Sequence, residues 1–138
     1  MPVKTKHRVI IDTNLWISFL LTNDYSKVDP LFANNNITLI FSQELIDEFI
    51  EVTLRPKFKK YFSLTDIEDL LKRVRKKAAF ISVTTTITTC RDPKDNFLLA
   101  LAKDGNATHL LTGDKDLLVL GNIGKTKILT LSDYIKNK

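Results

Sequence analysis

Short apolar runs alternate with longer amphipathic segments along the whole chain. Five of the runs have the length and composition of buried strands: residues 8–11, 37–41, 79–83, 109–112 and 127–129. Between them, apolar residues recur every three or four positions, which predicts helices. Strands that alternate with helices favour a mainly parallel sheet covered on both faces, so the expected fold is a three-layer α/β/α sandwich.

Turn and cap residues set the expected ends of the helices. The predicted helical segments are residues 15–21, 28–34, 43–54, 65–77, 96–104, 115–118 and 132–135. Ser42 is the expected N-cap of its helix, and Thr65 with Glu68 predicts a capping box. Pro56 ends a helix before a short amphipathic piece at 57–62. Residues 84–89 predict an extended threonine-rich loop, and residues 121–124 predict a turn.

Composition places the chain among ordinary globular proteins. Of its 138 residues, 43% are hydrophobic and 27% charged, and no linker or repeat divides them, so residues 1–138 predict one domain. No apolar run approaches the roughly 20 residues that span a bilayer, and the polar leader at 1–8 lacks a signal-peptide core. We therefore expect a cytoplasmic protein with no membrane contact. Cys90 is the single cysteine, which excludes an internal disulfide framework, and with His7 and His109 it is too sparse for a zinc site.

The distribution of charge favours a polyanionic partner. Net charge is +5 and the pI is about 9.3. Basic residues crowd the middle of the chain: Arg55, Lys57, Lys59, Lys60, Lys72, Arg73, Arg75, Lys76 and Lys77. Only three acids oppose them there, Asp66, Glu68 and Asp69. Such a run is often a solvated helix face, but with acids collected elsewhere nucleic acid is the favoured partner.

Several carboxylates stand where a parallel sheet would bring them together. Asp12 ends the first strand, Asp95 begins a helix, and Asp114 follows the strand at 109–112. Ligands of open α/β sheets bind outside the carboxyl ends of the strands, so these acids are expected to converge there. Each has an alternative interpretation, because an acid before a helix can simply cap it. The same holds for Asp92 before Pro93 and for Asp116.

Glu48 differs from the other acids of its helix. Three of them point well away from the apolar stripe: Glu44, Asp47 and Glu51. At about 100° per residue, Glu48 lies roughly 40° from Val52, between Leu45 and Val52. It therefore borders the buried face, where a carboxylate loses hydration unless a cation or donor faces it. A side chain that reaches out to solvent is the alternative.

Carboxylates that converge in this way are expected to bind a divalent cation. Neighbouring carboxylates raise one another's pKa unless a positive ion neutralises them, and Mg²⁺ or Mn²⁺ prefers oxygen ligands. Such an ion lowers the pKa of a water ligand and neutralises charge on a phosphate. An acidic pocket on a basic protein is suited to phosphodiester hydrolysis.

Five segments, in this order and spacing, carry a likeness to a known family. They read V-I-I-D-T-N from Val9, S-Q-E-L-I-D-E-F from Ser42, L-R-P-K-F from Leu54, R-D-P-K-D-N-F-L-L-A-L-A from Arg91, and L-L-T-G-D-K-D-L-L from Leu110. The chain resembles PIN domains over nearly its whole length, in particular the small prokaryotic members classed as toxin components of toxin–antitoxin systems (VapC-like ribonucleases). The resemblance implies a metal-dependent ribonuclease that uses water to leave a 5′-phosphate and a 3′-hydroxyl. It also implies an RNA substrate, a cognate antitoxin and a homodimer.

The resemblance assigns roles to individual residues. The family's acids correspond to Asp12, Glu48, Asp95 and Asp114. Asp12 and Asp95 are expected to hold the principal Mg²⁺ or Mn²⁺, Glu48 to orient or deprotonate the attacking water, and Asp114 to serve a second metal or an outer-shell water. Four further residues are expected to support the site: Asn14, Thr112, Asp116 and Asp92. The basic clusters at 55–60 and 72–77 are hypothesised to guide the RNA backbone.

Three other functions fit parts of the pattern. A haloacid dehalogenase phosphatase also begins with an Asp after its first strand, but its D-x-D pair needs Asp where Asn14 stands. A response-regulator receiver needs paired acids after its first strand and a phosphoacceptor Asp at the end of a central strand. This sequence contains neither feature in a clear form. A metal-free RNA-binding or partner-binding protein on the same scaffold would be expected to have lost at least one of the four acids.

Overall fold

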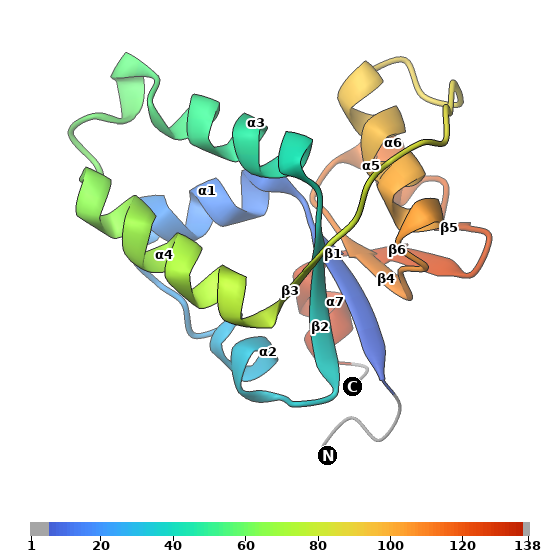
Figure 1. Ribbon diagram of the computed structural model, residues 1–138, viewed down its shortest axis with the longest axis horizontal. Helices are drawn as coiled ribbons and strands as arrows, with labels where there is room; N and C mark the ends of the chain where they lie inside the picture. Colours follow the sequence, from blue (N-terminus) through green and yellow to red (C-terminus); the bar gives the residue numbers. More distant parts are fainter. Residues whose placement is uncertain (1–5, 137–138) are drawn as a thin grey trace.

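The computed structural model describes residues 6–136 and contains a six-stranded sheet in the order β3-β2-β1-β4-β6-β5 (Figure 1). The strands are β1 (His7–Ile11), β2 (Ile37–Phe41), β3 (Ala78–Phe80), β4 (His109–Leu111), β5 (Asn122–Ile123) and β6 (Thr126–Leu129). All neighbouring pairs are parallel except β5 with β6. The predicted α/β/α architecture is therefore confirmed, with a mixed sheet in which parallel pairing dominates. Residues 1–5 of the predicted polar leader lie outside the described residues.

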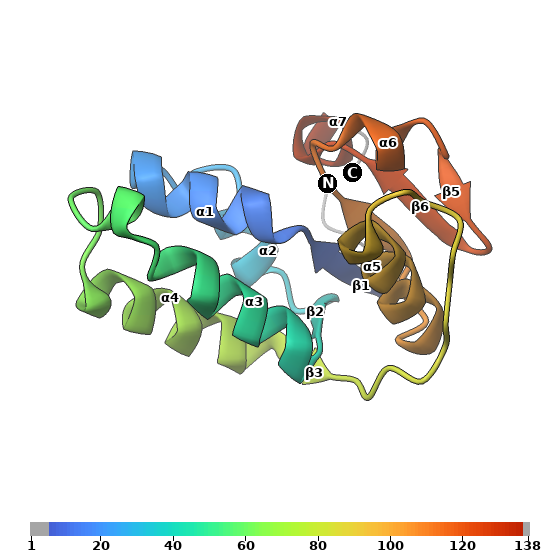
Figure 2. The same cartoon turned by 90° about the horizontal axis from the view of Figure 1, so that it is seen from above.

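Helices cover both faces of this sheet (Figures 1 and 2). In chain order they are α1 (Thr13–Thr22), α2 (Asp29–Ala33), α3 (Gln43–Thr53), the 3₁₀ turn η1 (Pro56–Phe58), α4 (Leu64–Lys77), α5 (Pro93–Asp104), α6 (Lys115–Leu118) and α7 (Leu131–Lys136). The helices α1 to α4 lie on one side of the sheet and α5 lies on the other. Within residues 6–136, none of these helices has the length and apolar character that crossing a bilayer requires.

The order of the strands creates a crevice between β1 and β4. The chain adds β2 and then β3 on one side of β1, and afterwards returns to place β4 on the other side. Right-handed crossovers therefore put α5 on the face opposite α1 to α4. Where the direction reverses, the connections at the carboxyl ends of two adjacent strands diverge, and ligands of open α/β sheets bind at that point.

The core explains why the first strands could be recognised from sequence. Val9, Ile10 and Ile11 are fully buried because β1 is central and covered on both faces.

Gly105, at the end of α5, lies so close to β2 that an added Cβ would stand 2.8 Å from Cγ2 of Ile40 and 2.9 Å from the carbonyl oxygen of Leu101. A larger residue there would push α5 away from the sheet.

The capping box of α4 differs from the prediction. The structure uses Ser63 and Asp66 in place of Thr65 and Glu68: Ser63 Oγ accepts from the Asp66 amide at 3.2 Å, and Asp66 Oδ2 accepts from the Ser63 amide at 2.9 Å. Both pairs have the required spacing. The observed box places two buried side chains, Phe62 and Ile67, at the positions that flank it, whereas the alternative would place the exposed Leu64 and Asp69 there.

Other predicted elements differ in extent, among them the helix predicted at 96–104, which begins at Pro93. The strand predicted at 79–83 ends at Phe80, and the chain that follows is held to α5, because Asp104 Oδ2 accepts from the amides of Thr84 at 2.7 Å and Thr85 at 2.9 Å. The turn predicted at 121–124 contains the short strand β5, flanked by Gly121 and Gly124 with φ of 74° and 54°. These positive φ angles suit glycine and let β5 pair antiparallel with β6.

Candidate active site

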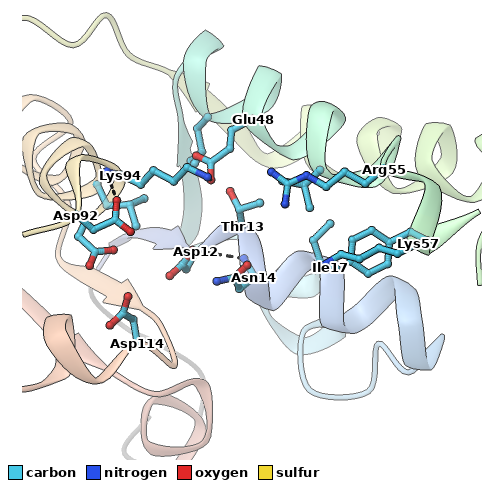
Figure 3. A pocket seen from close by; sticks show the side chains of 15 residues that line it. Asp12, Thr13, Asn14, Ile17, Glu48, Arg55, Lys57, Asp92, Lys94 and Asp114 are labelled. Carbon is cyan, nitrogen blue, oxygen red and sulfur yellow. Dashed lines mark hydrogen bonds and ion pairs between the residues drawn. The ribbon is translucent and has the colours of Figure 1, made fainter.

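The carboxyl ends of β1 and β4 open into a cavity of about 230 Å³ (Figure 3). All four predicted acids line it: Asp12, Glu48, Asp95 and Asp114. They come from the end of β1, the middle of α3, the first turn of α5 and the start of α6. Asp92 and Asn14 also line the cavity. Residues far apart in the sequence therefore meet at the switch point of the sheet.

Asp12 accepts two hydrogen bonds within the fold and also lines the cavity. Its Oδ2 accepts a hydrogen bond from Thr112 Oγ1 at 2.8 Å, and its Oδ1 accepts from the Asn14 amide at 3.4 Å. Asp12 is only 8% exposed. Burial raises the pKa of its carboxyl above the ordinary value, the bond from Thr112 lowers it, and the charge of Asp114 raises it. Asp12 is thus both the N-cap of α1 and part of the cavity wall.

The register of the two central strands fixes this arrangement. Ile11 pairs with Leu111, so the next residues, Asp12 and Thr112, leave the sheet side by side. The Thr112 hydroxyl donates to Asp12 and accepts from the Asp114 amide at 3.0 Å. Asp114 then caps α6, because its Oδ1 accepts from the Asp116 amide at 2.8 Å. One buried threonine therefore links the acids of two strands.

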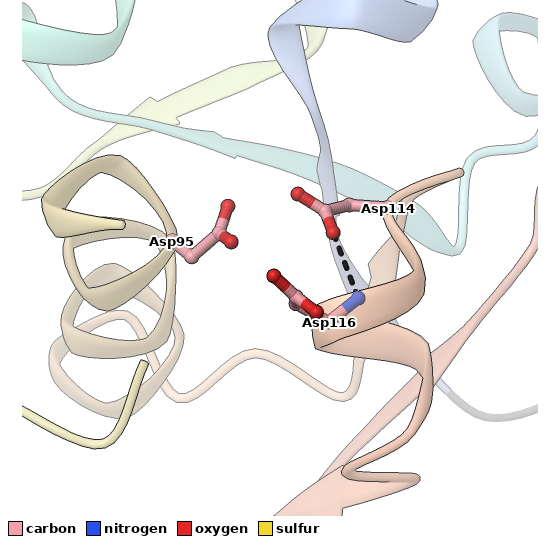
Figure 4. Close-up of side chains that lie close together, drawn as sticks. All are labelled: Asp95, Asp114 and Asp116. Carbon is pink, nitrogen blue, oxygen red and sulfur yellow. Dashed lines mark hydrogen bonds between the residues drawn. The ribbon is translucent and has the colours of Figure 1, made fainter. Parts of the chain in front are cut away.

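Among the described residues, Asp95, Asp114 and Asp116 form a tight acidic group (Figure 4). One carboxylate oxygen from each lies within 4.8 Å of the others. Asp95 is 5% exposed, and its Oδ2 is buried with no hydrogen-bond partner among residues 6–136. Burial, and next the charges of Asp114 and Asp92, raise the pKa of Asp95 to about 6. Asp116 lies on the exposed rim, where its carboxylate meets Arg91 at 3.3 Å.

This group fits a hard divalent cation. Magnesium takes oxygen ligands at roughly 2.0–2.1 Å, so oxygens on opposite sides of one ion are about 4 Å apart. The spacing within 4.8 Å is close to that value. The unpartnered oxygen of Asp95 and the like charges around it are unfavourable without a cation and become favourable with one. Asp12 lies in the same cavity but outside this tight group.

Glu48 faces the cavity from α3 and pairs with a cation of α5. Its Oε1 lies 3.8 Å from Lys94 Nζ, and its side chain is 28% exposed. Burial raises the pKa of Glu48, Lys94 lowers it, and the charges of Asp12 and Asp92 raise it. In Figure 3 the Lys94 side chain extends across the cavity to Glu48. The predicted position of Glu48 at the edge of the buried face agrees with this placement.

Asp92 and Asn14 stand at the mouth of the cavity. Asp92 is the N-cap of α5, where its Oδ1 accepts from the Lys94 amide at 2.9 Å, and it is exposed. Asn14 is also exposed and contributes its backbone amide to Asp12. Both are therefore within reach of a ligand in the cavity without being buried in it.

The predicted basic residues separate into two groups. Arg55 and Lys57 line the acidic cavity, and Lys59 and Lys60 are exposed in the turn just after η1. The α4 residues lie elsewhere. Arg73 forms an ion pair with Asp29.

The remaining basic residues of α4 belong to the fold or to open solvent. Besides its ion pair, Arg73 places its guanidinium 4.6 Å from the ring centre of Phe32. The Lys77 ammonium donates to the carbonyl oxygens of Asn34 and Ile37. Lys72 and Lys76 are exposed, and neither lines the cavity. The two clusters therefore do not form one surface next to the acids.

Besides apolar residues of the cavity wall, sequence reasoning missed Thr13, Lys94 and Phe58. Thr13 is 3% exposed, and its hydroxyl is buried without a hydrogen-bond partner among the described residues. In Figure 3 this hydroxyl points toward Glu48. Each of the three stands next to a residue or motif already singled out, in D-T-N, D-P-K-D and R-P-K-F. Their position next to these motifs is the signal from which the three residues could be found in the sequence.

Comparisons with known proteins agree with this geometry. The model of the PIN domain family matches residues 8–116, which include all four acids of the cavity. The chain is also 31% identical over 125 residues to the uncharacterized protein MJ1680 of Methanocaldococcus jannaschii, and the match covers 88% of this chain and 80% of that protein. No solved structure matches the chain. With most of its length matched by the family model, the chain belongs to the PIN domain family.

Proposed function

We propose that this protein is a metal-dependent endoribonuclease that hydrolyses phosphodiester bonds in the acidic cavity. PIN domains are generally nucleases, and they typically bind divalent metals. The observation that carries the proposal is Asp95, a buried carboxylate beside Asp114 and Asp116 with one oxygen that has no hydrogen-bond partner in the described part of the chain. Such an arrangement is unfavourable unless a cation belongs there.

The protein residues then have distinct roles. Asp95 and Asp114 would hold the ion, with Asp116 at the rim and with Asp12, which Thr112 links to Asp114, either as a direct ligand or through water. The ion would neutralise charge on the phosphate and lower the pKa of water. Glu48, whose pKa is raised by burial, would orient the attacking water and accept its proton. Thr112 positions Asp12 and Asp114 together.

A cleavage assay tests this proposal. Purified protein is incubated with end-labelled RNA and with single-stranded DNA, in Mg²⁺, in Mn²⁺ and in chelator. We expect metal-dependent cleavage of RNA that leaves 5′-phosphate ends. The variants Asp95→Asn and Glu48→Gln should each lose it by a factor of at least about 100, as expected when a group acting in the transition state is removed.

A matched variant distinguishes the site from a general effect of charge. Glu51→Gln changes an exposed acid of the same helix as Glu48 and should cleave as the unaltered protein does. Cleavage that survives chelator and both site substitutions would overturn the proposal. RNA binding without cleavage at any metal concentration would instead favour the alternative, a catalytically silent PIN scaffold. The phosphatase alternative has Asn14 where its second acid is required, and family membership favours a nuclease.

We further propose a role as the toxin of a toxin–antitoxin pair, on the strength of the sequence resemblance. Induced expression in a bacterial host should then arrest growth, whereas Asp95→Asn should be tolerated at equal abundance. The partners expected with this role are an antitoxin and a second copy of the chain. Normal growth during expression of a protein that is active in vitro would contradict the toxin role and leave the ribonuclease proposal intact.

A further inference from the structure

We propose that Arg55, Lys57 and Phe58 form a subsite for one unpaired ribonucleotide beside the acidic group, an inference that rests on the proposed ribonuclease function. Arg55 and Lys57 would bind a phosphate that neighbours the one being cut. The ring of Phe58 would stack on a base. The substrate would accordingly be RNA that is single-stranded at this position.

The local sequence places these three residues on the cavity. The helix α3 ends at Thr53, and Pro56 starts the short turn η1, closed by a hydrogen bond from the Phe58 amide to the Arg55 carbonyl oxygen at 3.0 Å. This turn brings Arg55, Lys57 and Phe58 into the wall that Asp12, Glu48 and Asp95 complete. Figure 3 shows Arg55 and Lys57 at the side of the cavity away from Asp92 and Asp114. Arg55 and Lys57 thus lie at the end of the cavity opposite Asp92 and Asp114, whereas the third cation, Lys94, pairs with Glu48.

The two cations are available for a ligand. Within residues 6–136, Arg55 and Lys57 form no ion pair with an acid. By contrast, Arg73 and Lys77 of α4 are held by Asp29 and by backbone carbonyl oxygens. A polyanion that approaches the cavity would find at η1 two cations that no acid of the described residues neutralises. The predicted guiding role of the basic residues is therefore concentrated in this turn.

Phe58 has the properties of a stacking platform. Its ring stacks on the buried Phe62 ring, with centroids 5.7 Å apart and an interplanar angle of 23°. The Lys57 ammonium lies 5.1 Å from the centre of the Phe58 ring. The ring is thus fixed from one side, so stacking on it costs little entropy. A base could replace the ammonium there, and Lys57 would then be free to bind phosphate.

The stacking ring beside two cations also indicates which kind of RNA the subsite would bind. A base in a duplex is stacked on both faces and cannot lie on an aromatic side chain until it is unstacked. The cavity volume of about 230 Å³ is small, which favours a single strand over a helix. Electrostatic contacts at Arg55 and Lys57 alone would not distinguish one base from another, because they address only the phosphate.

Binding measurements can test the subsite apart from cleavage. The Asp95→Asn protein in chelator is titrated with fluorescent single-stranded RNA, with the same strand carrying an abasic position at each site in turn, and with a duplex of the same sequence. We expect preference for the single strand. Phe58→Leu, which keeps an apolar side chain, should weaken binding of the intact strand by roughly tenfold and leave its salt dependence unchanged. For the strand whose abasic position falls at the subsite, Phe58→Leu should leave the affinity unchanged.

Arg55→Gln and Lys57→Gln should each reduce the slope of log affinity against log salt by about 0.7, the value for one phosphate contact to a single strand. Lys72→Gln, an exposed position of α4, is the matched control and should leave the slope unchanged. Equal effects of Phe58→Leu on every strand, a duplex preference, or no binding at all would overturn the subsite. Cleavage by the unaltered protein, assayed in parallel on the same RNA, tests the ribonuclease proposal independently.

Discussion

Asp95 is the residue at which function and stability are expected to conflict. Its carboxyl is buried beside Asp114 and Asp92, and its pKa is raised from 3.8 to about 6. A folded-state pKa above the unfolded value means that the folded protein binds the proton more tightly. The stability that the neutral Asp95 carboxyl contributes is therefore fully present below pH 3.8 and is lost as the pH rises through about 6.

We predict that Asp95→Asn stabilises the metal-free protein at neutral pH, because it removes a buried charge among like charges. The increase in the free energy of unfolding should be on the order of 1–3 kcal/mol at pH 7.5 and should vanish below about pH 4. Urea unfolding in chelator at several pH values measures it. Asp47→Asn, on the exposed face of α3, should show no such pH-dependent gain. A destabilised Asp95→Asn protein at pH 7.5 would contradict the prediction.

Thr13 allows the function of a single hydroxyl to be separated from its effect on folding. Its oxygen is buried, lacks a partner among the described residues and points toward Glu48. We predict that Thr13→Val lowers the cleavage rate by about tenfold, the value of one positioning hydrogen bond, without lowering the unfolding temperature.

The reason is that an unpaired buried hydroxyl contributes nothing to the fold but can hold a water or a substrate oxygen next to Glu48. Thr13→Ser keeps the hydroxyl and should retain most of the rate. Rates under single-turnover conditions, together with thermal unfolding of each variant, provide the measurement. A fully active Thr13→Val protein would exclude the role.

At the scale of elements, the connection from β3 to α5 depends on one carboxylate. Asp104 accepts from the amides of Thr84 and Thr85 and from the Thr85 hydroxyl. These bonds, that of the Thr85 hydroxyl first, lower the pKa of Asp104 to about 2. The stability that Asp104 contributes is therefore present above pH 3.8 and is lost as the pH falls toward 2.

We predict that Asp104→Ala lowers the urea midpoint at pH 7, because three donors lose their acceptor. The difference from the unaltered protein should shrink between pH 4 and pH 2. Thr85→Val removes only the hydroxyl donor and should have a smaller effect at pH 7. Equal midpoints for Asp104→Ala and the unaltered protein at pH 7 would show that the connection is stable without this carboxylate.

At the scale of the whole molecule, a cation in the acidic group should stabilise the fold. Metal that binds the folded protein but not the unfolded chain raises stability by about 2.7 kcal/mol at one hundred times its dissociation constant. For a chain of this size the unfolding temperature should rise by roughly 5–10 °C in saturating Mn²⁺.

Calorimetry in Mn²⁺ and in chelator checks this expectation, with no RNA present. Asp95→Asn and Asp114→Asn should each abolish most of the rise, because they remove ligands of the tight group. Glu51→Gln should retain it. An identical rise in all the variants would indicate that the metal binds elsewhere.

The sequence predicted the elements where burial leaves a clear pattern. The strand β1 is buried on both faces, so its apolar run was recognisable, whereas β5 has two residues between positive-φ glycines and has no pattern of its own. The start of α4 was misplaced because two overlapping pairs satisfy the same capping rule. Only the burial of Phe62 and Ile67 decides between them.

The site was predictable to the extent that strand ends determine it. Asp12 and Asp114 follow adjacent strands, so their convergence could be expected from topology alone. The pairing of Lys94 with Glu48 depends on how α5 is rotated against α3, and nothing local to either sequence reports that rotation. Likewise, the use of Arg73 and Lys77 by the fold depends on distant partners, Asp29 and the carbonyl oxygen of Asn34.

The threonine-rich connection between β3 and α5 separates the four predicted acids of the cavity into two pairs. Asp12 and Glu48 precede it, and Asp95 and Asp114 follow it, while β1 of the first part pairs with β4 of the second. A polypeptide severed at residue 87 would therefore yield two pieces, each with only two of these four carboxylates. Their reassembly through the β1–β4 ladder would be the condition for recovering a complete cavity, which makes this chain suited to a split-protein reporter.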